Sequence, residues 1–285
     1  MYLRTDKIFV KVGGLTISSH KNLAFDKRWM LDPTALVGWY DGTDTRREST
    51  QRTFSNGDFA DSAKKGSRLI SMSGLAEADT PQLLGQMRDA FTGLLSHGGY
   101  ELIEITDASG PRYAEVGISG TPSWIRQTDT FATWKIDFYA PSPEIWGEKS
   151  TVVITDETLL GGLDYPLAYP MSYGTPKNNN DAYITNRGNY RTFPTFKVTG
   201  DFPSGFHVKN NKGSIVTYSG LVSSASPVVI DMAKGTAIQN GSDRTTFITR
   251  RDWFSIPAYG TIRPAFEPIQ DGPGWCDIIY RDTWI

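Results

Sequence analysis

Only one segment of this sequence has the periodicity of an amphipathic helix, and that limits the folds open to the chain. Seven apolar residues recur at helical spacing and share one side of a helical wheel: Leu83, Leu84, Met87, Ala90, Phe91, Leu94 and Leu95. Asp79 or Thr80 is placed to cap this helix, Pro81 suits its first position, and Gly98-Gly99 follows its expected end. The pattern predicts a single helix lying on a core.

The sequence pattern of the remaining part of the first half predicts strands. The chain contains 28 glycines, 16 prolines and 12% aromatic residues, which favours many short strands over long helices. Residues 131–139 alternate most clearly, with three residues on the expected core face and three on the other: Trp134, Ile136 and Phe138 against Thr133, Lys135 and Asp137. This period of two predicts a half-buried antiparallel strand. Further strands are expected at 8–12, 68–73, 100–106 and 113–119, with a turn at 107–111.

The proline-containing segment after this strand predicts a domain boundary. Pro141 and Pro143 cannot continue a ladder of backbone hydrogen bonds, so the sheet should stop there. A length of 285 residues suits two domains, which we place at 1–148 and 149–285. The second half has no convincing helix. Its short apolar runs predict an all-β sandwich, with a polar loop at 173–189; the runs are 192–199, 214–218, 228–232, 245–248, 253–256 and 275–280.

Charge and cysteine content exclude several classes of protein. The 29 Lys and Arg residues nearly balance 31 Asp and Glu residues, so a net charge of -2 is unsuited to holding nucleic acid by its overall field. The single cysteine, Cys276, excludes an intrachain disulfide and a zinc site built from cysteines. No signal peptide is expected, and no run of 18 apolar residues predicts a membrane span. We expect a soluble, β-rich protein.

No set of residues has the pattern of a catalytic, metal or cofactor site. The histidines His20, His97 and His207 lie far apart in sequence and show no ligand spacing, and Cys276 lies in a terminal strand as a buried thiol. Neither a phosphate-binding nor a dinucleotide-binding glycine pattern is present. Residues 117–120 match part of a nucleophile elbow, but Thr121 follows and no helix is expected there. The prediction is therefore no enzyme, no cofactor and no metal.

Three groups of residues leave a second interpretation open. Asp41 and Asp44 beside two aromatic residues resemble a sugar or calcium site, although a turn with capping aspartates is favoured. Residues 178–181 suggest calcium but lack the alternating ligand spacing. Four aromatic residues of the second half would suit a carbohydrate platform, although core or interface positions are favoured: Trp253, Phe254, Trp275 and Trp284. The basic pairs 46–47, 64–65 and 250–251 are expected on solvated faces.

Three stretches of the chain resemble a known family. The first contains Gly38-Trp39-Tyr40-Asp41-Gly42, Asn56-Gly57-Asp58-Phe59 and the run 66–75, and the second runs from Phe131 into Tyr139-Ala140-Pro141-Ser142-Pro143. The third comprises Asn186-Arg187-Gly188, 193–200, Val229-Ile230-Asp231, Arg251-Asp252-Trp253, Ile256-Pro257 and 279–285. Their order and spacing are similar to those of the distal tail proteins (Dit) of long-tailed bacteriophages, often described as minor tail proteins. Residues 257–260 depart from the Pro-Pro-Gly expected in many relatives.

The resemblance implies a mainly β fold. The first domain would be a tail-tube-like β-barrel or sandwich with one packed α-helix, and the second a galectin-like β-sandwich. It also implies a homohexameric ring in the virion that joins the tail tube to the baseplate, made in the host cytoplasm, with DNA passing through its centre. Its partners would be the tail tube protein, the tail hub or tail-associated protein and the tape measure protein, with no membrane.

The back of the helix is a candidate assembly contact. Its residues are small or short: Gly85, Asp89, Thr92, Gly93 and Ser96. Each interior glycine costs a helix about 1 kcal/mol relative to alanine, so close packing by a neighbour would explain two of them. Alternatively, these five residues are neutral surface positions.

Two rival functions remain from the sequence. A carbohydrate-binding module would use the second domain on host glycans, and a cell-wall hydrolase would use dispersed carboxylates.

Overall fold

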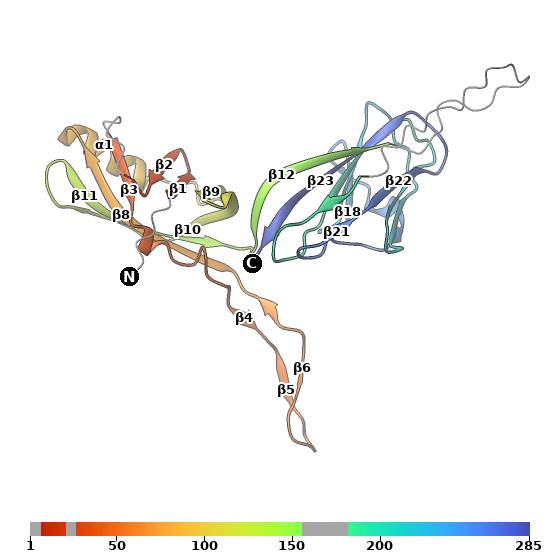
Figure 1. Ribbon diagram of the computed structural model, residues 1–285, viewed down its shortest axis with the longest axis horizontal. Helices are drawn as coiled ribbons and strands as arrows, with labels where there is room; N and C mark the ends of the chain where they lie inside the picture. Colours follow the sequence, from red (N-terminus) through yellow and green to blue (C-terminus); the bar gives the residue numbers. More distant parts are fainter. Residues whose placement is uncertain (1–6, 21–26, 156–181) are drawn as a thin grey trace, which may run out of the picture. The chain divides into compact units, whose positions relative to one another are not determined.

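The structure, a computed structural model, describes residues 7–20, 27–155 and 182–285 (Figure 1). The chain divides into two compact units, Met1–Gly147 with Ile285, and Glu148–Trp284. Each is built mainly from strands, as the sequence predicts. No helix in the described part is long and apolar enough to cross a membrane.

Unit 1 is a closed barrel. Its strands are β1 (Phe9–Val12), β2 (Leu15–Ser18), β3 (Lys27–Leu31), β8 (Arg68–Ala78), β9 (Glu101–Asp107), β10 (Gly110–Arg126) and β11 (Phe131–Ala140). They follow the order β11-β8-β3-β2-β1-β9-β10, and pairing between β10 and β11 closes the circle. Most neighbours are antiparallel, while β2 and β3 are joined by a parallel bridge between Ser18 and Met30. A closed barrel needs tightly packed side chains inside, and these come from the alternating strands.

Strand β11 confirms the predicted alternation. Trp134, Ile136 and Phe138 are buried, whereas Lys135 on the opposite face is exposed. β11 pairs with β8 along its whole length. At Gly74 of β8 a Cβ atom would lie 1.9 Å from the carbonyl oxygen of Met30 and 2.8 Å from the Trp134 ring. Only glycine fits there, because the indole and the neighbouring strand occupy the space of any side chain.

The helix α1 (Pro81–Thr92) begins as predicted and ends earlier than predicted. The Thr80 hydroxyl accepts a hydrogen bond from the Leu83 N–H at 3.3 Å, so Thr80 is the cap. At the other end Gly93 is the capping residue, and its N–H donates to the Asp89 carbonyl at 3.0 Å. Leu94 and Leu95 are buried from the turn beyond the helix. Leu94 and Leu95 continue the apolar spacing of α1 although they lie in a turn. The predicted helix is therefore too long.

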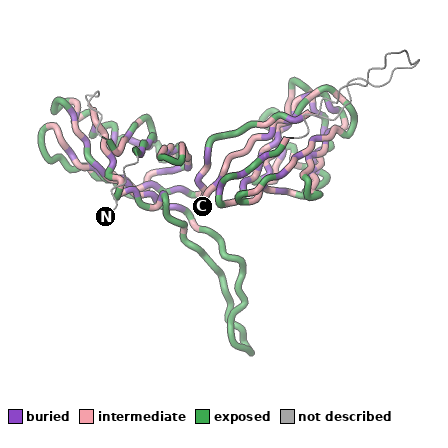
Figure 2. Tube along the Cα trace, in the orientation of Figure 1, coloured by how far each residue is buried: buried purple, intermediate pink, exposed green. Residues whose placement is uncertain are grey.

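A long hairpin projects from unit 1 between β3 and β8, after the short 3-10 turn η1 (Pro33–Ala35) (Figure 1). It consists of β4 (Thr45–Arg46) paired with β7 (Lys64–Lys65), and β5 (Ser49–Gln51) paired with β6 (Asp58–Ala60). Every one of residues 44–65 is exposed (Figure 2). We call residues 44–65 the arm. The sequence analysis predicts no strand here.

The two units are joined by β12 (Ile145–Ile154). β11 stops at Ala140 before Pro141, as expected for a proline-containing segment. β12 begins in unit 1, where Trp146 pairs with Tyr113, and continues into unit 2.

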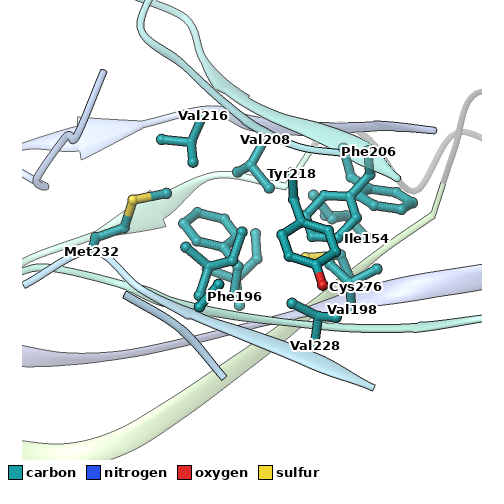
Figure 3. Close-up of a cluster of buried hydrophobic side chains, with 14 of the residues drawn as sticks. Ile154, Phe196, Val198, Phe206, Val208, Val216, Tyr218, Val228, Met232 and Cys276 are labelled. Carbon is teal, nitrogen blue, oxygen red and sulfur yellow. The ribbon is translucent and has the colours of Figure 1, made fainter. Parts of the chain in front are cut away.

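Unit 2 is a sandwich of two sheets. One has the order β23-β14-β17-β18-β19 with β12 beside β23, the other has the order β20-β16-β15-β22, and β13 pairs with β21. The bounds are β13 (Ile184–Thr185), β14 (Thr195–Gly200), β15 (Phe206–Asn210), β16 (Ile215–Tyr218), β17 (Val228–Asp231), β18 (Thr236–Gln239), β19 (Ser242–Asp243), β20 (Ile248–Arg251), β21 (Thr261–Ile262), β22 (Pro264–Pro268) and β23 (Gly274–Trp284). Phe196, Phe206, Tyr218 and Cys276 lie in its core (Figure 3).

Three predictions for unit 2 are wrong in part. The run 245–248 begins as a 3-10 turn, η2 (Thr245–Phe247), because the Asp243 carboxylate accepts from the Thr245 N–H at 2.8 Å. The run 253–256 forms no strand, and only Ile256 makes a bridge, with Thr192. The loop expected at 173–189 lies outside the described residues up to 181. Its remainder contains β13 and the buried Asn186.

Candidate assembly surfaces

The structure places the predicted contact strip partly on the helix and partly beyond it. Asp89 and Thr92 are exposed on α1, and Gly93 and Ser96 are exposed after it. Gly85 is half-buried, with no atom within 4 Å of the position a Cβ would take. Gly93 caps the helix with φ -85° and ψ -3°, a right-handed conformation that any residue adopts, so the cap does not require glycine. The strip remains a predicted contact.

A second surface lies on the outer face of β8, β11 and β10. The register aligns residues across these three strands in rows: Ser71 with Asp137 and Ser119, and Ser73 with Lys135 and Ser123. The next row, Leu75 with Thr133 and Ile125, is more apolar. We call the six residues of the first two rows the polar sheet face.

The polar sheet face offers hydrogen-bonding groups without net charge. Lys135 Nζ lies 3.7 Å from Asp137 Oδ2, so its one cation and one anion offset each other. The other Asp137 oxygen is buried without a hydrogen-bond partner in the described part of the chain. Tight binding to DNA depends on several cations that neutralise phosphates. This face, with one cation that an anion offsets, therefore has no set of free cations that would hold DNA tightly.

A buried arginine fixes the root of the arm. Arg68, at the start of β8, is 3% exposed. Its Nη1 donates to the carbonyls of Gly38 at 2.5 Å and Asp41 at 2.7 Å, and its Nη2 donates to the Pro143 carbonyl at 3.1 Å. Burial lowers the pKa of the Arg68 guanidinium, and the nearby Asp41 carboxylate opposes that shift. One side chain thus ties the loop before the arm to the segment that precedes β12.

The same loop accounts for the aspartates that resembled a sugar or calcium site. The Asp41 carboxylate accepts a hydrogen bond from the Gly38 N–H at 2.7 Å, so it closes a turn. Tyr40 donates to the Asp107 carboxylate at 2.9 Å. In the described ranges no group of three or more His, Cys, Asp or Glu residues is arranged to hold a metal. Residues 178–181 lie outside the described part of the chain.

The remaining chemical candidates lie in different surroundings in the described part of the chain. His20 and His97 are exposed, and His207 Nδ1 lies 2.9 Å from the Thr217 hydroxyl. Desolvation raises the pKa of the fully buried Cys276 thiol well above its ordinary value. The segment 117–120 lies within β10 and not at a turn from a strand into a helix.

The aromatic residues of unit 2 are divided between core and surface. Phe254 is buried, with its ring centroid 5.8 Å from that of Phe196. Trp253 and Trp284 are half-buried, while Trp275 on β23 is 42% exposed. Because Phe254 packs into the sandwich, the four residues do not form the platform considered from the sequence.

The motif Asn186-Arg187-Gly188 of unit 2 has a structural role. Asn186 is fully buried; its Nδ2 donates to the Tyr190 and Pro257 carbonyls, and its Oδ1 accepts from the Gly188 and Thr283 N–H groups. All four hydrogen-bonding positions of the amide are used. A Cβ at Gly188 would lie 1.8 Å from the Thr283 carbonyl oxygen. The motif therefore anchors the C-terminal strand, a role that sequence reasoning missed.

A comparison with protein-family models matches part of unit 2. Residues 187–284 match the family described as siphovirus-type tail component, C-terminal domain. A comparison with curated protein sequences found no match. Most of unit 2 is therefore similar to the C-terminal domain of siphovirus-type tail components.

Solved structures extend the likeness to both units. The chain is similar to SPP1 Dit, described as a paradigm of the hub adsorption apparatus in phages that infect Gram-positive bacteria, with 12% identity and a TM-score of 0.64. The match covers 98% of this chain and 99% of that one. A chain of the phage P2 baseplate in its calcium-activated conformation matches with 10% identity and a TM-score of 0.50, covering 97% and 98%. The resemblance to distal tail proteins is confirmed, as is the mainly β fold.

Proposed function

We propose that this chain forms a homohexameric ring in the virion that joins the tail tube to the baseplate and lets DNA pass through its centre. The observation that carries the proposal is the likeness of both units, along almost their whole length, to SPP1 Dit. The first domain, 1–148, forms the ring, and the second, 149–285, faces the adsorption apparatus. The partners are the tail tube protein, the tail hub or tail-associated protein and the tape measure protein, with no membrane. Synthesis takes place in the host cytoplasm.

An unpaired edge of β10, beyond the part that pairs with β9, supports self-assembly. The first part of β10, Gly110–Val116, pairs with β9, but residues 123–126 pair only with β11 on their other side. No strand of the described residues covers the remaining edge there. Unpaired edges invite another chain, and a head-to-tail contact closes into a ring when the rotation allows it. A neighbouring subunit that covers this edge would satisfy its backbone groups.

The polar sheet face supports the passage of DNA. If the polar sheet face lined the channel of the ring, the channel would contain short serine side chains and one compensated pair of charges. Few cations would then be available to bind phosphates. Six chains of net charge -2 would carry about -12 in total (six times -2). A strongly basic channel would hold the duplex and slow its exit.

Native mass spectrometry of the purified full chain tests the ring. Six copies of a 31.6 kDa chain give about 190 kDa (six times 31.6). The proposal expects this mass, together with sixfold rings in negative-stain images. A monomer at every concentration, or an oligomer without sixfold symmetry, contradicts it.

A further inference from the structure

The small sheet of unit 2, β13 with β21, carries the same three residue types on both of its strands. Every second residue of each strand points outward, since Ile184, Asn186 and Ile262 between them are buried. The register sets Thr185 opposite Thr261, and their two hydroxyl oxygens are 2.9 Å apart. A tyrosine and an arginine flank each threonine at the next outward positions. We call these six residues the tyrosine–arginine strip: Tyr183, Thr185, Arg187, Tyr259, Thr261 and Arg263.

The two strands run in opposite directions, so each tyrosine of the strip lies beside an arginine. The register of β13 with β21 places Tyr183 beside Arg263. At the other end the Tyr259 N–H donates to the Gly188 carbonyl at 3.0 Å, which brings Arg187 beside Tyr259. Residues directly opposite each other in antiparallel strands have Cβ atoms about 5 Å apart. The two tyrosine–arginine pairs are four residues apart, which corresponds to about 13 Å at about 3.3 Å per residue.

Arg187 offers its charge to a ligand. Its backbone N–H donates to the Asp282 carboxylate at 2.8 Å, which fixes the main chain. Its side chain is exposed, and the guanidinium forms no ion pair within the described ranges. None of the six residues of the strip is acidic, although the chain as a whole has a net charge of -2. A guanidinium in such a surface favours an anionic group, to which it donates two parallel hydrogen bonds.

Tyr259 gives a second, independent reason to expect a ligand. Its φ is 50°, a left-handed conformation that glycine adopts without strain and a bulky residue rarely adopts. Its side chain is 74% exposed, so burial does not compensate for this strain. Strained residues of this kind occur at ligand-binding positions. A flat ligand stacked on the ring would bury it, and Tyr183, which is 65% exposed, offers a second ring of the same kind.

We propose that the tyrosine–arginine strip binds an acidic polysaccharide in which uronate and neutral sugars alternate. A uronate sugar that stacks on Tyr259 brings its own carboxylate to the adjacent Arg187. The next uronate takes the equivalent place beside Tyr183 and Arg263. The neutral sugar between them meets the two threonine hydroxyls, which donate to and accept from sugar hydroxyls. The proposal goes beyond the ring and does not depend on it.

Isothermal titration calorimetry of the full chain with a hyaluronan hexasaccharide tests this site. Hyaluronan alternates glucuronate with N-acetylglucosamine, and saturable binding is expected with a Kd of about 1 mM or below. A chitin hexasaccharide, which contains only N-acetylglucosamine, should bind at least about tenfold more weakly because it lacks the carboxylates. Arg187→Met should cause a similar loss and keep the fold, since the backbone bond to Asp282 remains. Arg47→Met removes the same charge from the exposed arm and should change the affinity by less than about twofold.

Tyr259→Gly separates binding from stability. Glycine adopts the observed φ without strain, so the midpoint of thermal unfolding should stay the same or rise. The affinity for the hyaluronan hexasaccharide should nevertheless fall by about fivefold, because the stacking ring is lost. Tyr259→Phe keeps the ring and should bind within about twofold of the unmodified chain. A purely structural role for Tyr259 predicts the opposite, a lower midpoint with unchanged binding.

Three results overturn the proposal. They are the absence of saturable binding of the hyaluronan hexasaccharide, equal binding of the chitin hexasaccharide, and unchanged binding by Arg187→Met. A hexathymidylate that binds more tightly than hyaluronan and loses affinity in the same variants also overturns it, because the strip is then a site for single-stranded nucleic acid. A chain that binds the saccharide and forms no ring contradicts the proposed function and leaves the site intact.

Discussion

Replacing Trp134 with alanine should destabilise unit 1 strongly. The indole is 2% exposed, and its ring centroid lies 5.8 Å from that of Phe91 and 6.2 Å from that of Trp29. Deleting a buried Trp typically costs about 3–5 kcal/mol through lost burial and the cavity left behind. The Trp134 N–H is buried without a hydrogen-bond partner in the described residues, so its removal recovers roughly 1 kcal/mol. The expected net cost is therefore about 2–4 kcal/mol.

Urea unfolding of the full chain, followed by hydrogen exchange of peptides from β8 and β11, measures this cost in unit 1. With a slope of about 2 kcal/mol per molar urea, the midpoint for these peptides should fall by roughly 1–2 M. Trp134→Phe should lie in between, since it keeps a ring against Phe91 and removes the unpartnered N–H. Lys135→Ser, on the exposed face of the same strand, should stay within about 0.5 kcal/mol. Equal midpoints for Trp134→Ala and Lys135→Ser would refute the assignment of the two faces.

Three further outcomes follow from single side chains. Gly85→Ala should stabilise the helix by about 1 kcal/mol, because nothing occupies the space of the new methyl group. Gly74→Ala should lower the free energy of unfolding of unit 1 by more than about 2 kcal/mol, and the reverse order would contradict the packing. Arg68→Met should cost about 3 kcal/mol and speed hydrogen exchange in the loop at 38–41, since partly buried carbonyls lose a charged donor. Unchanged exchange would show that Arg68 does not hold the root of the arm. Cys276 should resist a thiol reagent in the native chain and react once urea unfolds it, and rapid native reaction would contradict its burial.

Local patterns predicted the elements whose energetics are local. The alternation around Trp134 identified β11 and its buried face, and Thr80 with Pro81 marked the start of α1. The end of α1 was mispredicted because Leu94 and Leu95 are buried by tertiary packing of a turn, and their spacing is indistinguishable from that of a helix. Helix propensity and apolar periodicity do not distinguish a buried turn from a further turn of helix.

The surfaces and the long-range networks could not be predicted in the same way. The strands of the arm are two or three residues long and bury nothing, so residues 44–65 have no apolar alternation to detect. Asn186 holds Thr283, 97 positions away in sequence, and only the folded chain brings them together. The contact strip at the back of α1 is inferred from small and short residues, Gly85 and Gly93 among them, and it stays a prediction.

The most direct test of the proposed function is a cryo-electron-microscopy reconstruction of the tail that carries this chain. The proposal predicts six copies in one ring at the junction of the tail tube and the baseplate, with the polar sheet face toward the central channel. Density for this chain outside that junction, or copies bound singly on the surface of the tip, would contradict it.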